Sequence, residues 1–529
     1  MCSRTLAALI IYLSTVTTAS SSPSATVDAG VVIGTTTSLP SSATTVNKFL
    51  GIPFAAPPVR FTAPQKPKPW SEPLDTKTVK PACIQQFVYP KESSDLIQSF
   101  FNNPAAEESE DCLYLNVFAP ATPAPENGRA VMFWIYGGAL QFGHGGHPVY
   151  DGSKFASGED VIVVTHNYRT NVFGFPSSPE LPLTGHNLGW LDQRFALDWV
   201  QRNIHAFGGN PNKVTVFGES AGAWSTDALL TSYPANSKPP FRAAILQSGQ
   251  ISYHSPIEAD TTSSWLTLAA ALNCSDTKGT LECIRVAPAA TIKTIVDQQS
   301  LPFWPVPDNV TLIEDPVQAR VSGNIARIPI LSGTNAQESR IIVLGLTNTT
   351  AYLNSIGVSP DAIPRIEAAY PIGSSEFPTA YDAIAQMATD YSLHCPDALL
   401  TNATATSGIP AWRYYFNASF PNTQFLPDLG VFHASELWIV FGTYPLANAT
   451  AQEAALSNYM RETWARFAKY PVAGPGWNAV GTGSDFFGGA GDLDIGLVGS
   501  EGSAGVEVIR QAEVDSRCSL WVPILTAGS

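Results

Sequence analysis

The stretch FGGNPNKVTVFGESAGAWS, residues 207–225, decides the fold of this chain. The apolar run at 214–217 predicts a buried strand, and apolar residues at helical spacing from 221 to 229 predict a helix directly after it. Ser220 lies at the corner between them, with a glycine two residues away on either side. Because a sharp strand-to-helix turn crowds the backbone, glycine is needed there. The pattern therefore predicts a serine hydroxyl exposed at the edge of a sheet.

Strand-like and helix-like segments alternate along much of the chain. The five residues 218–222 alone could also be an ordinary turn that contains G-x-S-x-G by chance. The pattern of the whole chain must therefore decide between a nucleophile and an ordinary turn. Short apolar strands alternating with amphipathic helices predict an α/β fold, with a mostly parallel central sheet and helices on both faces. No boundary divides the pattern, so we expect a single domain at 21–529 with long insertions. The strand-like runs are 130–136, 161–167, 214–217, 243–246 and 328–331, and a helix-like segment covers 192–203.

The composition favours a large core and argues against one class of partner. The 529 residues are 44% hydrophobic and 14% charged, which is enough apolar surface for a sizeable core. The net charge of -15, without any basic block, argues against nucleic acid, because phosphate binding needs clustered Lys and Arg. The acidic balance does not identify a substrate.

The N-terminal residues 1–20 resemble a secretory signal peptide. Arg4 precedes an apolar run at 6–13, and small and hydroxylated residues follow. The run is too short for a membrane span, and the C-terminus lacks the hydrophobic tail of a lipid anchor. We therefore expect a secreted, extracellular protein. Six sequons agree with this, at Asn273, Asn309, Asn348, Asn402, Asn417 and Asn448.

The cysteines predict disulfides and no metal site. Cys2 leaves with the signal peptide, and the other six suggest three disulfides in an oxidising compartment. The count leaves their connectivity open. His394 and Cys395 have no partners at ligand spacing, so we expect no metal. One possible arrangement is Cys83–Cys112, Cys274–Cys283 and Cys395–Cys518.

A serine nucleophile needs backbone donors for the oxyanion, and a Gly-rich loop is a candidate source. Gly138 and Ala139 follow the strand-like run 130–136, and with Ala221 they could bind a negative oxygen. A phosphate-binding loop is the competing interpretation, but no G-K-S/T follows. We expect His144 and His147, further along this loop, to be surface residues.

The base and the acid have candidates at later strand ends. His433 lies between a Pro-containing loop and a helical stretch, and Glu338 follows the apolar run 328–331. The order Ser220, Glu338, His433 is that of the α/β-hydrolases. A core histidine and a solvated glutamate are the plain alternatives for these two positions.

At this point the sequence resembles a known family, the type-B carboxylesterases/lipases, which includes cholinesterases and fungal lipases. The motif F-G-G-x(4)-V-x-V-x-G-x-S-A-G is matched in full at 207–222, and a second signature, EDCLYLNV, is present at 110–117. The resemblance runs from about Gly51 to the C-terminus. Further blocks that look like the family's are 51–55, 167–169 and 187–193.

The resemblance implies roles for the candidate residues. Ser220 would be the nucleophile, Glu338 the acid and His433 the base, and no cofactor is required. The backbone of Gly138, Ala139 and Ala221 would form the oxyanion hole. Ala139 stands where many relatives have a third glycine, and Gln337 where relatives often have Asp. The disulfides implied are Cys83–Cys112, Cys274–Cys283 and Cys395–Cys518.

The Cys83–Cys112 loop is the expected lid over the site. Apolar residues at one-turn spacing from 96 to 101 could form one face of a short helix that contacts acyl chains or a lipid interface. A loop packed onto the core is the alternative. The lid is rich in apolar residues, namely Phe87, Val88, Tyr89, Leu96, Ile97, Phe100 and Phe101.

The resemblance implies ester hydrolysis and leaves the substrate open. We expect a lipase or esterase on fatty acyl esters, acting on small-molecule or lipid substrates. An esterase for small or hydroxycinnamoyl esters is the alternative. The lid loop lacks the tryptophan with which cholinesterases bind quaternary ammonium, so choline esters are not expected to be preferred. Some relatives are adhesion proteins that lost the serine, but this chain keeps all three triad residues.

Overall fold

The computed structural model describes residues 22–40, 42–87, 91–253, 261–275, 279–481, 493–500 and 502–527. The predicted signal peptide, and the lid residues Val88 and Tyr89, lie outside this part of the chain. Within it, no helix is both long and apolar enough to span a membrane.

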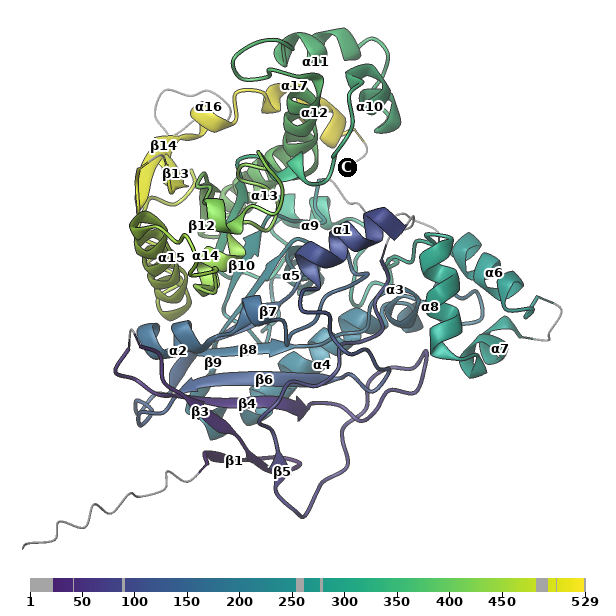
Figure 1. Cartoon of the computed structure of the whole chain (residues 1–529), viewed down its shortest axis with the longest axis vertical. Coiled ribbons are helices and arrows are strands. Elements are labelled where there is room, and N and C mark those ends of the chain that lie inside the picture. The colour runs from purple at the N-terminus through teal and green to yellow at the C-terminus, as the bar shows by residue number, and fades with distance from the viewer. Residues whose placement is uncertain are drawn as a thin grey trace, which may run out of the picture.

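An 11-stranded sheet forms the centre of the molecule, in the order β14-β13-β12-β11-β10-β9-β7-β8-β6-β4-β3 (Figure 1). The strands from β8 to β13 run parallel, while β6, β4 and β3 at one edge and β14 at the other are antiparallel. This confirms the predicted α/β fold with a mostly parallel sheet. A separate small sheet has the order β1-β2-β5.

The strand bounds follow the predicted runs within a few residues. The 214–217 run is the buried half of one longer strand, β9, which ends at Glu219 just before the serine. The strands are β1 Ser24–Val27, β2 Gly30–Ile33, β3 Thr35–Thr37, β4 Val46–Pro53, β5 Leu74–Asp75, β6 Tyr114–Pro120, β7 Arg129–Ile135, β8 Ile162–His166, β9 Gly209–Glu219, β10 Ala243–Gln247, β11 Ile330–Asn335, β12 Ala411–Phe416, β13 Leu493–Val498 and β14 Val506–Arg510.

Helices cover both faces of the sheet. Every residue of β7, β8, β10 and β11 is buried, as expected for strands enclosed on two sides. One layer contains α2, α14 and α15, and another contains α5, α9 and α13. The helices are α1 Lys91–Phe101, α2 Ser153–Glu159, α3 Asn171–Gly174, α4 Leu188–Asn203, α5 Ala221–Ser232, α6 Thr262–Ala271, α7 Thr280–Val286, α8 Ala289–Gln298, α9 Pro316–Val321, α10 Thr349–Ser355, α11 Ile363–Ala369, α12 Ala380–Thr389, α13 Cys395–Thr406, α14 Leu437–Phe441, α15 Ala451–Lys469, α16 Gln511–Val514 and α17 Cys518–Leu525.

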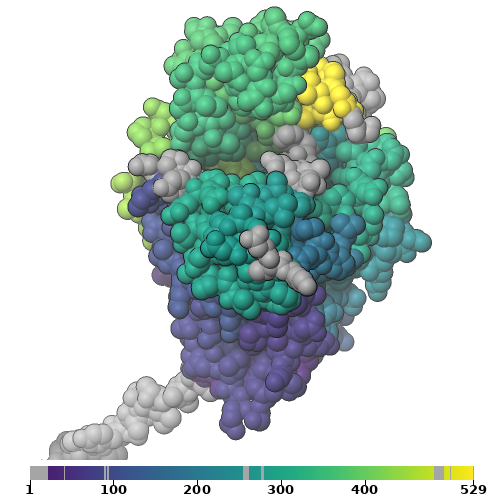
Figure 2. Space-filling model, turned by 90° about the vertical axis from the view of Figure 1, so that its right-hand side faces the viewer, coloured from purple at the N-terminus to yellow at the C-terminus, as the bar shows by residue number. Residues whose placement is uncertain are grey.

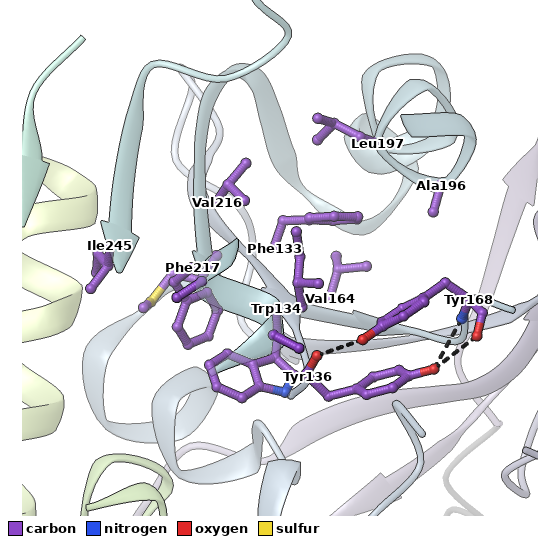
Figure 3. Close-up of a cluster of buried hydrophobic side chains, with 14 of the residues drawn as sticks. Phe133, Trp134, Tyr136, Val164, Tyr168, Ala196, Leu197, Val216, Phe217 and Ile245 are labelled. Carbon is purple, nitrogen blue, oxygen red and sulfur yellow. Dashed lines mark hydrogen bonds between the residues drawn. The ribbon is translucent and has the colours of Figure 1, made fainter. Parts of the chain in front are cut away.

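Two tyrosines fix the end of β7, where the Gly-rich loop begins (Figure 3). The hydroxyl of Tyr136 donates to the carbonyl of Tyr168 at 3.0 Å, and the hydroxyl of Tyr168 donates to the carbonyl of Tyr136 at 2.9 Å. Their rings stack with centroids 4.3 Å apart. Because buried polar groups need partners, this reciprocal pair satisfies both hydroxyls and fixes the backbone next to Gly137.

A second, smaller core lies above the end of the sheet. It joins α10, α11, α12 and α17 through residues such as Ile366, Met387 and Trp521. Figure 2 shows this green lobe facing the teal lobe of α6–α8, with a hollow between them. A five-residue π-helix, Asp390–His394, connects α12 to α13 beneath the upper lobe.

Three disulfides lie within or against the two hydrophobic cores. Cys83–Cys112 closes the lid loop, Cys274–Cys283 links α6 to α7, and Cys395–Cys518 ties α17 to the start of α13. This is the pairing that the family resemblance implies. The predicted single domain at 21–529 stays a prediction.

Candidate active site

Ser220 lies at the turn between β9 and α5 with a strained backbone, at φ 54° and ψ -122°. Residues other than glycine rarely adopt such angles, and strain of this kind is concentrated at functional sites. The flanking glycines are sterically required. A Cβ on Gly218 would lie 2.5 Å from the carbonyl carbon of Gly222, and one on Gly222 would collide with the carbonyl oxygen of Ile135. The sequence pattern therefore forms the sharp turn that it predicted.

The Gly-rich loop lies against this turn. Gly138, Ala139 and Leu140 have φ angles of 95°, 54° and 58°, so the loop has positive φ at three consecutive residues. A Cβ on Gly137 would lie 3.0 Å from the Cβ of Ser220, which places the loop backbone directly beside the serine. Within the described residues, the backbone amides of Gly138, Ala139 and Ala221 donate no hydrogen bond. These free donors can bind a negatively charged oxygen at Ser220.

His433, on the loop before α14, contacts Glu338, on the segment that follows β11. The Nδ1 atom of His433 lies 2.7 Å from Oε2 of Glu338, and its backbone N–H donates to the carbonyl of Glu338 at 3.1 Å. Glu338 is fully buried, and its Oε1 accepts the N–H of Asn335 at 2.6 Å. The carboxylate therefore orients the imidazole so that Nε2 is the nitrogen left for chemistry.

A second carboxylate lies at the other nitrogen of the ring. Oε1 of Glu219 is 3.2 Å from Nε2 of His433, a charge contact without the geometry of a hydrogen bond. No hydrogen bond joins the hydroxyl of Ser220 to His433 in the described part of the chain. Without substrate such bonds are often long and tighten only in the complex, so Ser220 remains a candidate nucleophile.

Charge and burial act against each other at this histidine. Burial lowers the pKa of His433, but the negative charges of Glu219, Glu338 and Glu436 outweigh it and raise the pKa to about 9. Burial raises the pKa of Glu219 to about 8, opposed by His433. Because the two groups interact directly, they titrate as a pair that holds a proton near neutral pH.

A hydrogen-bond chain behind the site joins the serine turn to the histidine loop. The carbonyl of Gln247 accepts the N–H of Ser220 at 2.9 Å, and its side-chain amide donates to Glu436 at 3.0 Å. Asn335 donates to Glu436 at 2.6 Å and to the carbonyl of Phe432 at 2.9 Å. These hydrogen bonds fix the distance between the serine turn and the histidine loop.

A cavity of about 340 Å³ opens at Ser220 and His433. Its walls are mainly apolar, with Phe142 from the Gly-rich loop, Trp224 from α5 and Leu393 from the π-helix. The polar groups are few. Gln250 donates from Nε2 to the carbonyl of Ser392 at 3.1 Å, while its buried Oε1 has no partner in the described chain. Apolar walls with a few polar groups are typical of a small-molecule site.

Helix α1, within the expected lid, borders one side of this cavity. Phe101 lines the cavity and lies 6.1 Å from the ring of Phe142, while Phe100 is buried and lies 4.7 Å from the ring of Phe425. Phe425 also approaches Phe432, the residue before His433, at 6.0 Å. Helix α1 thus contacts the Gly-rich loop directly and the histidine loop through Phe425, while its role as a lid stays a prediction.

Three polar residues that were expected to be accessible are buried. His144 and His147 are not surface residues, because both are buried and their rings lie 5.6 Å apart. Burial lowers their pKa values to about 3 and 4, so both stay neutral. Asn402 is also buried and bonds the side chain of Gln511 at 3.2 Å, so in the folded protein it is no acceptor for a glycan. The other five sequon asparagines are exposed.

The structure brings His394 close to Asp515 and Cys518, the kind of group that can hold a metal. Cys518, however, is bonded to Cys395 in a disulfide, so its sulfur is not a thiolate ligand. The imidazole of His394 lies 2.8 Å from Asp515, which Arg413 also contacts. We interpret this group as a structural ion-pair cluster.

Sequence reasoning gave no role to Glu219, Glu436, Gln250 or Ser392. Glu219 lies within the motif that identified Ser220, and its position next to the serine was the one available signal. Glu436, Gln250 and Ser392 are brought to the site by contacts between residues far apart in sequence. Gln247 and Glu436, for example, are 189 positions apart. No local pattern reports such a contact.

The fold and the site geometry define an α/β-hydrolase, with a strained serine after a central strand and an acid and a histidine at later strand ends. Residues 21–482 match the Carboxylesterase family, to which this chain therefore belongs, and the protein is a carboxylic ester hydrolase. The earlier resemblance is thus confirmed.

Curated relatives and solved structures agree with this family. The chain is 34% identical over 446 residues to para-nitrobenzyl esterase of Bacillus subtilis, covering 80% of this chain and 86% of the relative. It is 34% identical over 467 residues to acetylcholinesterase of Bungarus fasciatus, at 80% and 75% coverage. Liver carboxylesterase 1F of Rattus norvegicus is 31% identical, at 85% and 86%. A solved structure of PNB esterase superposes with a TM-score of 0.75 and 30% identity, covering 94% of this chain and 99% of that one.

Proposed function

We propose that this esterase acts through a Ser220–Glu338–His433 triad and a covalent acyl-enzyme. The observation that carries the proposal is the 2.7 Å contact between His433 and Glu338 beside the strained Ser220 turn. His433 takes the proton of Ser220 as the oxygen attacks the ester carbonyl, and Glu338 holds the tautomer and stabilises the imidazolium. His433 then protonates the departing alcohol. A water molecule, activated by the same base, releases the acid and restores Ser220.

The free amides of Gly138, Ala139 and Ala221 would stabilise the tetrahedral intermediate. As fixed donors aimed at the developing negative oxygen, each would contribute roughly 3 kcal/mol to the transition state. No cofactor enters any step. The disulfides and the short apolar segment at 6–13 support secretion to an oxidising compartment.

Fatty acyl esters are the substrates that the walls of the cavity favour. Phe142, Trp224 and Leu393 offer apolar area, and Phe101 extends it onto the lid. Exposed apolar side chains continue from the cavity to the surface, with Ile342 at its edge and Phe425 against the lid. A lid with one apolar face and an apolar rim suits transient contact with a lipid interface.

The polar atoms of Gln250 and Ser392 favour a second candidate, esters of hydroxylated aromatic acids. A buried acceptor without a partner, such as Oε1 of Gln250, is an unfavourable arrangement unless water or a ligand satisfies it. A hydroxyl on an aromatic acyl group would do so between flat aromatic walls. A site that bonds a substrate hydroxyl rejects the analogue that lacks it.

A p-nitrophenyl ester series from acetate to palmitate tests both candidates, with emulsified triglyceride, methyl ferulate and methyl cinnamate alongside. A long-chain optimum that rises at the emulsion would support the lipase. A ferulate preference over cinnamate, lost in Gln250→Leu, would support the aromatic esterase. Full activity in Ser220→Ala would overturn the triad under either candidate.

A further inference from the structure

A second cavity lies outside the catalytic one, at the ends of β11 and β12. It has a volume of about 240 Å³ and is bounded by residues of β12, α12 and the segment that carries Glu338. Gln337 and Arg340 form one wall, and Tyr415 and Phe377 contribute aromatic side chains. The same Gln337 and Arg340 border an adjoining hollow of about 550 Å³. The ester chemistry described above uses neither space.

A sequon borders both spaces. Asn417 is exposed and lines the smaller cavity, and Ser419, the third residue of the Asn417-Ala418-Ser419 sequon, lines the adjoining hollow. The backbone of Asn417 is held in place, because its N–H donates to the carbonyl of Val498 at 2.9 Å. The first sugar of a glycan attached to this asparagine would lie at the rim of the cavity.

The charges around the cavity are already balanced. Arg340 pairs with Asp382 at 2.8 Å, and Glu376 pairs with Arg517 at 2.6 Å. A cavity without net charge gains little from an ionic ligand. Amide and carboxylate groups, together with the partly exposed ring of Tyr415, instead match a neutral ligand that has several hydroxyls and a small apolar face. N-acetylglucosamine, the first sugar of an N-glycan, has this chemistry.

We propose that the core N-acetylglucosamine units of an N-glycan on Asn417 occupy this cavity. The proposal rests on the expected passage of the chain through the secretory route. The glycan would brace the acid segment, because Gln337 exchanges two hydrogen bonds with Val431, both at 3.0 Å, and so connects Glu338 to the histidine loop. The sugar would thus contact the wall that positions the triad and would touch no substrate.

Native deglycosylation tests the proposal directly. The secreted wild-type protein is treated with an endoglycosidase that cleaves between the two core sugars, and glycopeptides are quantified over time by mass spectrometry. Asn348, an exposed residue that caps α10, is the matched control within the same molecule. We expect cleavage at Asn417 to be at least about tenfold slower than at Asn348, because the bond is reached only on local opening. After denaturation the two sites should be cleaved alike.

Three variants provide a thermal readout. Ser419→Ala removes the glycan and keeps Asn417, Ser419→Thr keeps the sequon, and Thr350→Ala removes the control glycan while leaving the Asn348 cap of α10 in place. We expect Ser419→Ala to lower Tm by about 2 °C or more, with the other two within error of wild type. An unmodified Asn417, cleavage as fast as at Asn348, or equal Tm values for all three variants would each overturn the proposal. Ester hydrolysis by the wild type is scored separately, so a failed glycan proposal leaves the enzymatic one intact.

Discussion

Two histidines of this protein contact carboxylates, one of them fully buried and the other partly exposed, and their surroundings differ in charge balance. His394 lies 2.8 Å from Asp515, and Arg413 bonds both Asp515 and Asp397, at 2.5 and 2.9 Å. The charged groups that raise the pKa of His433 are all carboxylates. The first cluster therefore contains a cation that neutralises its acids. In the second, Glu219, Glu338 and Glu436 surround the histidine, and no cation among these groups balances their charge.

The surroundings differ in access as well. Both ring nitrogens of His394 have hydrogen-bonding neighbours, Thr334 at 3.1 Å from Nδ1 and the carbonyl of Val514 at 3.1 Å from Nε2, and Ser332 is bonded to Asp397. His433 instead lines an open cavity with one nitrogen free for chemistry. The balanced, closed cluster can only hold the fold together, whereas the unbalanced, open one has a tuned base. Charge balance and access thus separate a structural histidine from a reactive one.

The largest expected effect is a loss of kcat at the open site that contains Ser220 and His433. Ser220→Ala removes the nucleophile and should lower kcat by about 10⁶, while the unfolding midpoint stays close to that of wild type. Hydrolysis of p-nitrophenyl butyrate and a urea titration measure the two quantities. A variant that loses activity because it unfolds would show the comparison to be wrong.

The closed cluster should show the opposite pattern. Arg413→Met leaves Asp397 and Asp515 buried without their cation, and should reduce the free energy of unfolding by about 3–5 kcal/mol. The folded fraction should keep its KM, since Arg413 lies outside the cavity. Denaturant unfolding and kinetics below the transition measure both. A stability loss under about 1 kcal/mol would mean that the ion pairs contribute no more than exposed ones.

The pH dependence of catalysis tests the effect of the carboxylates on His433. His433 must be neutral to accept the proton of Ser220, so kcat/KM should rise with pH through a raised pKa, above the ordinary value of 6.5. Glu219→Gln removes one of the charges that stabilise the imidazolium, so the acid limb should move to lower pH by about 1 unit or more. The pH profile of kcat/KM for both proteins is the measurement. An unchanged limb would remove Glu219 from the set of groups acting on His433.

The smallest expected effect concerns access through the lid. Phe100→Ala removes the ring contact with Phe425, which is worth about 0.5–1.5 kcal/mol beyond burial. Activity on a dissolved long-chain ester should rise a fewfold, and the extra activation at an emulsion should shrink. Phe425→Ala, which removes the other ring of this contact, should change the two activities in the same direction. Opposite effects of the two variants would show that the pair does not hold the lid.

Most of the fold could be predicted because its signals are local. The runs at 130–136 and 243–246 became β7 and β10 within a residue, since a strand enclosed on both faces is apolar throughout. The turn at Ser220 was predictable for a similar reason, because steric crowding there demands glycine. The helix face at 96–101 likewise followed from spacing alone.

The site could be predicted only in part. Ser220 came from its motif, but Glu338 and His433 were two of several possible acids and bases until the family resemblance selected them. Glu436 could not be found, because its contacts with Gln247 and Asn335 span 189 and 101 positions. The prediction that His144 and His147 lie at the surface is wrong, because polar residue type predicts exposure only on average and this loop packs against Gln85 and Phe87.

The buried sequon at Asn402 has a consequence for biosynthesis. Its partner Gln511 lies 109 positions later in the chain. On the proposed secretory route, Asn402 would therefore reach the glycosylation machinery before Gln511 has been made. A glycan added at that moment would prevent α16 from docking and leave the chain unable to mature. The secreted population should therefore be enriched in chains that escaped modification there. Peptide mass spectrometry of secreted and retained fractions should find Asn402 bare in the first and partly occupied in the second.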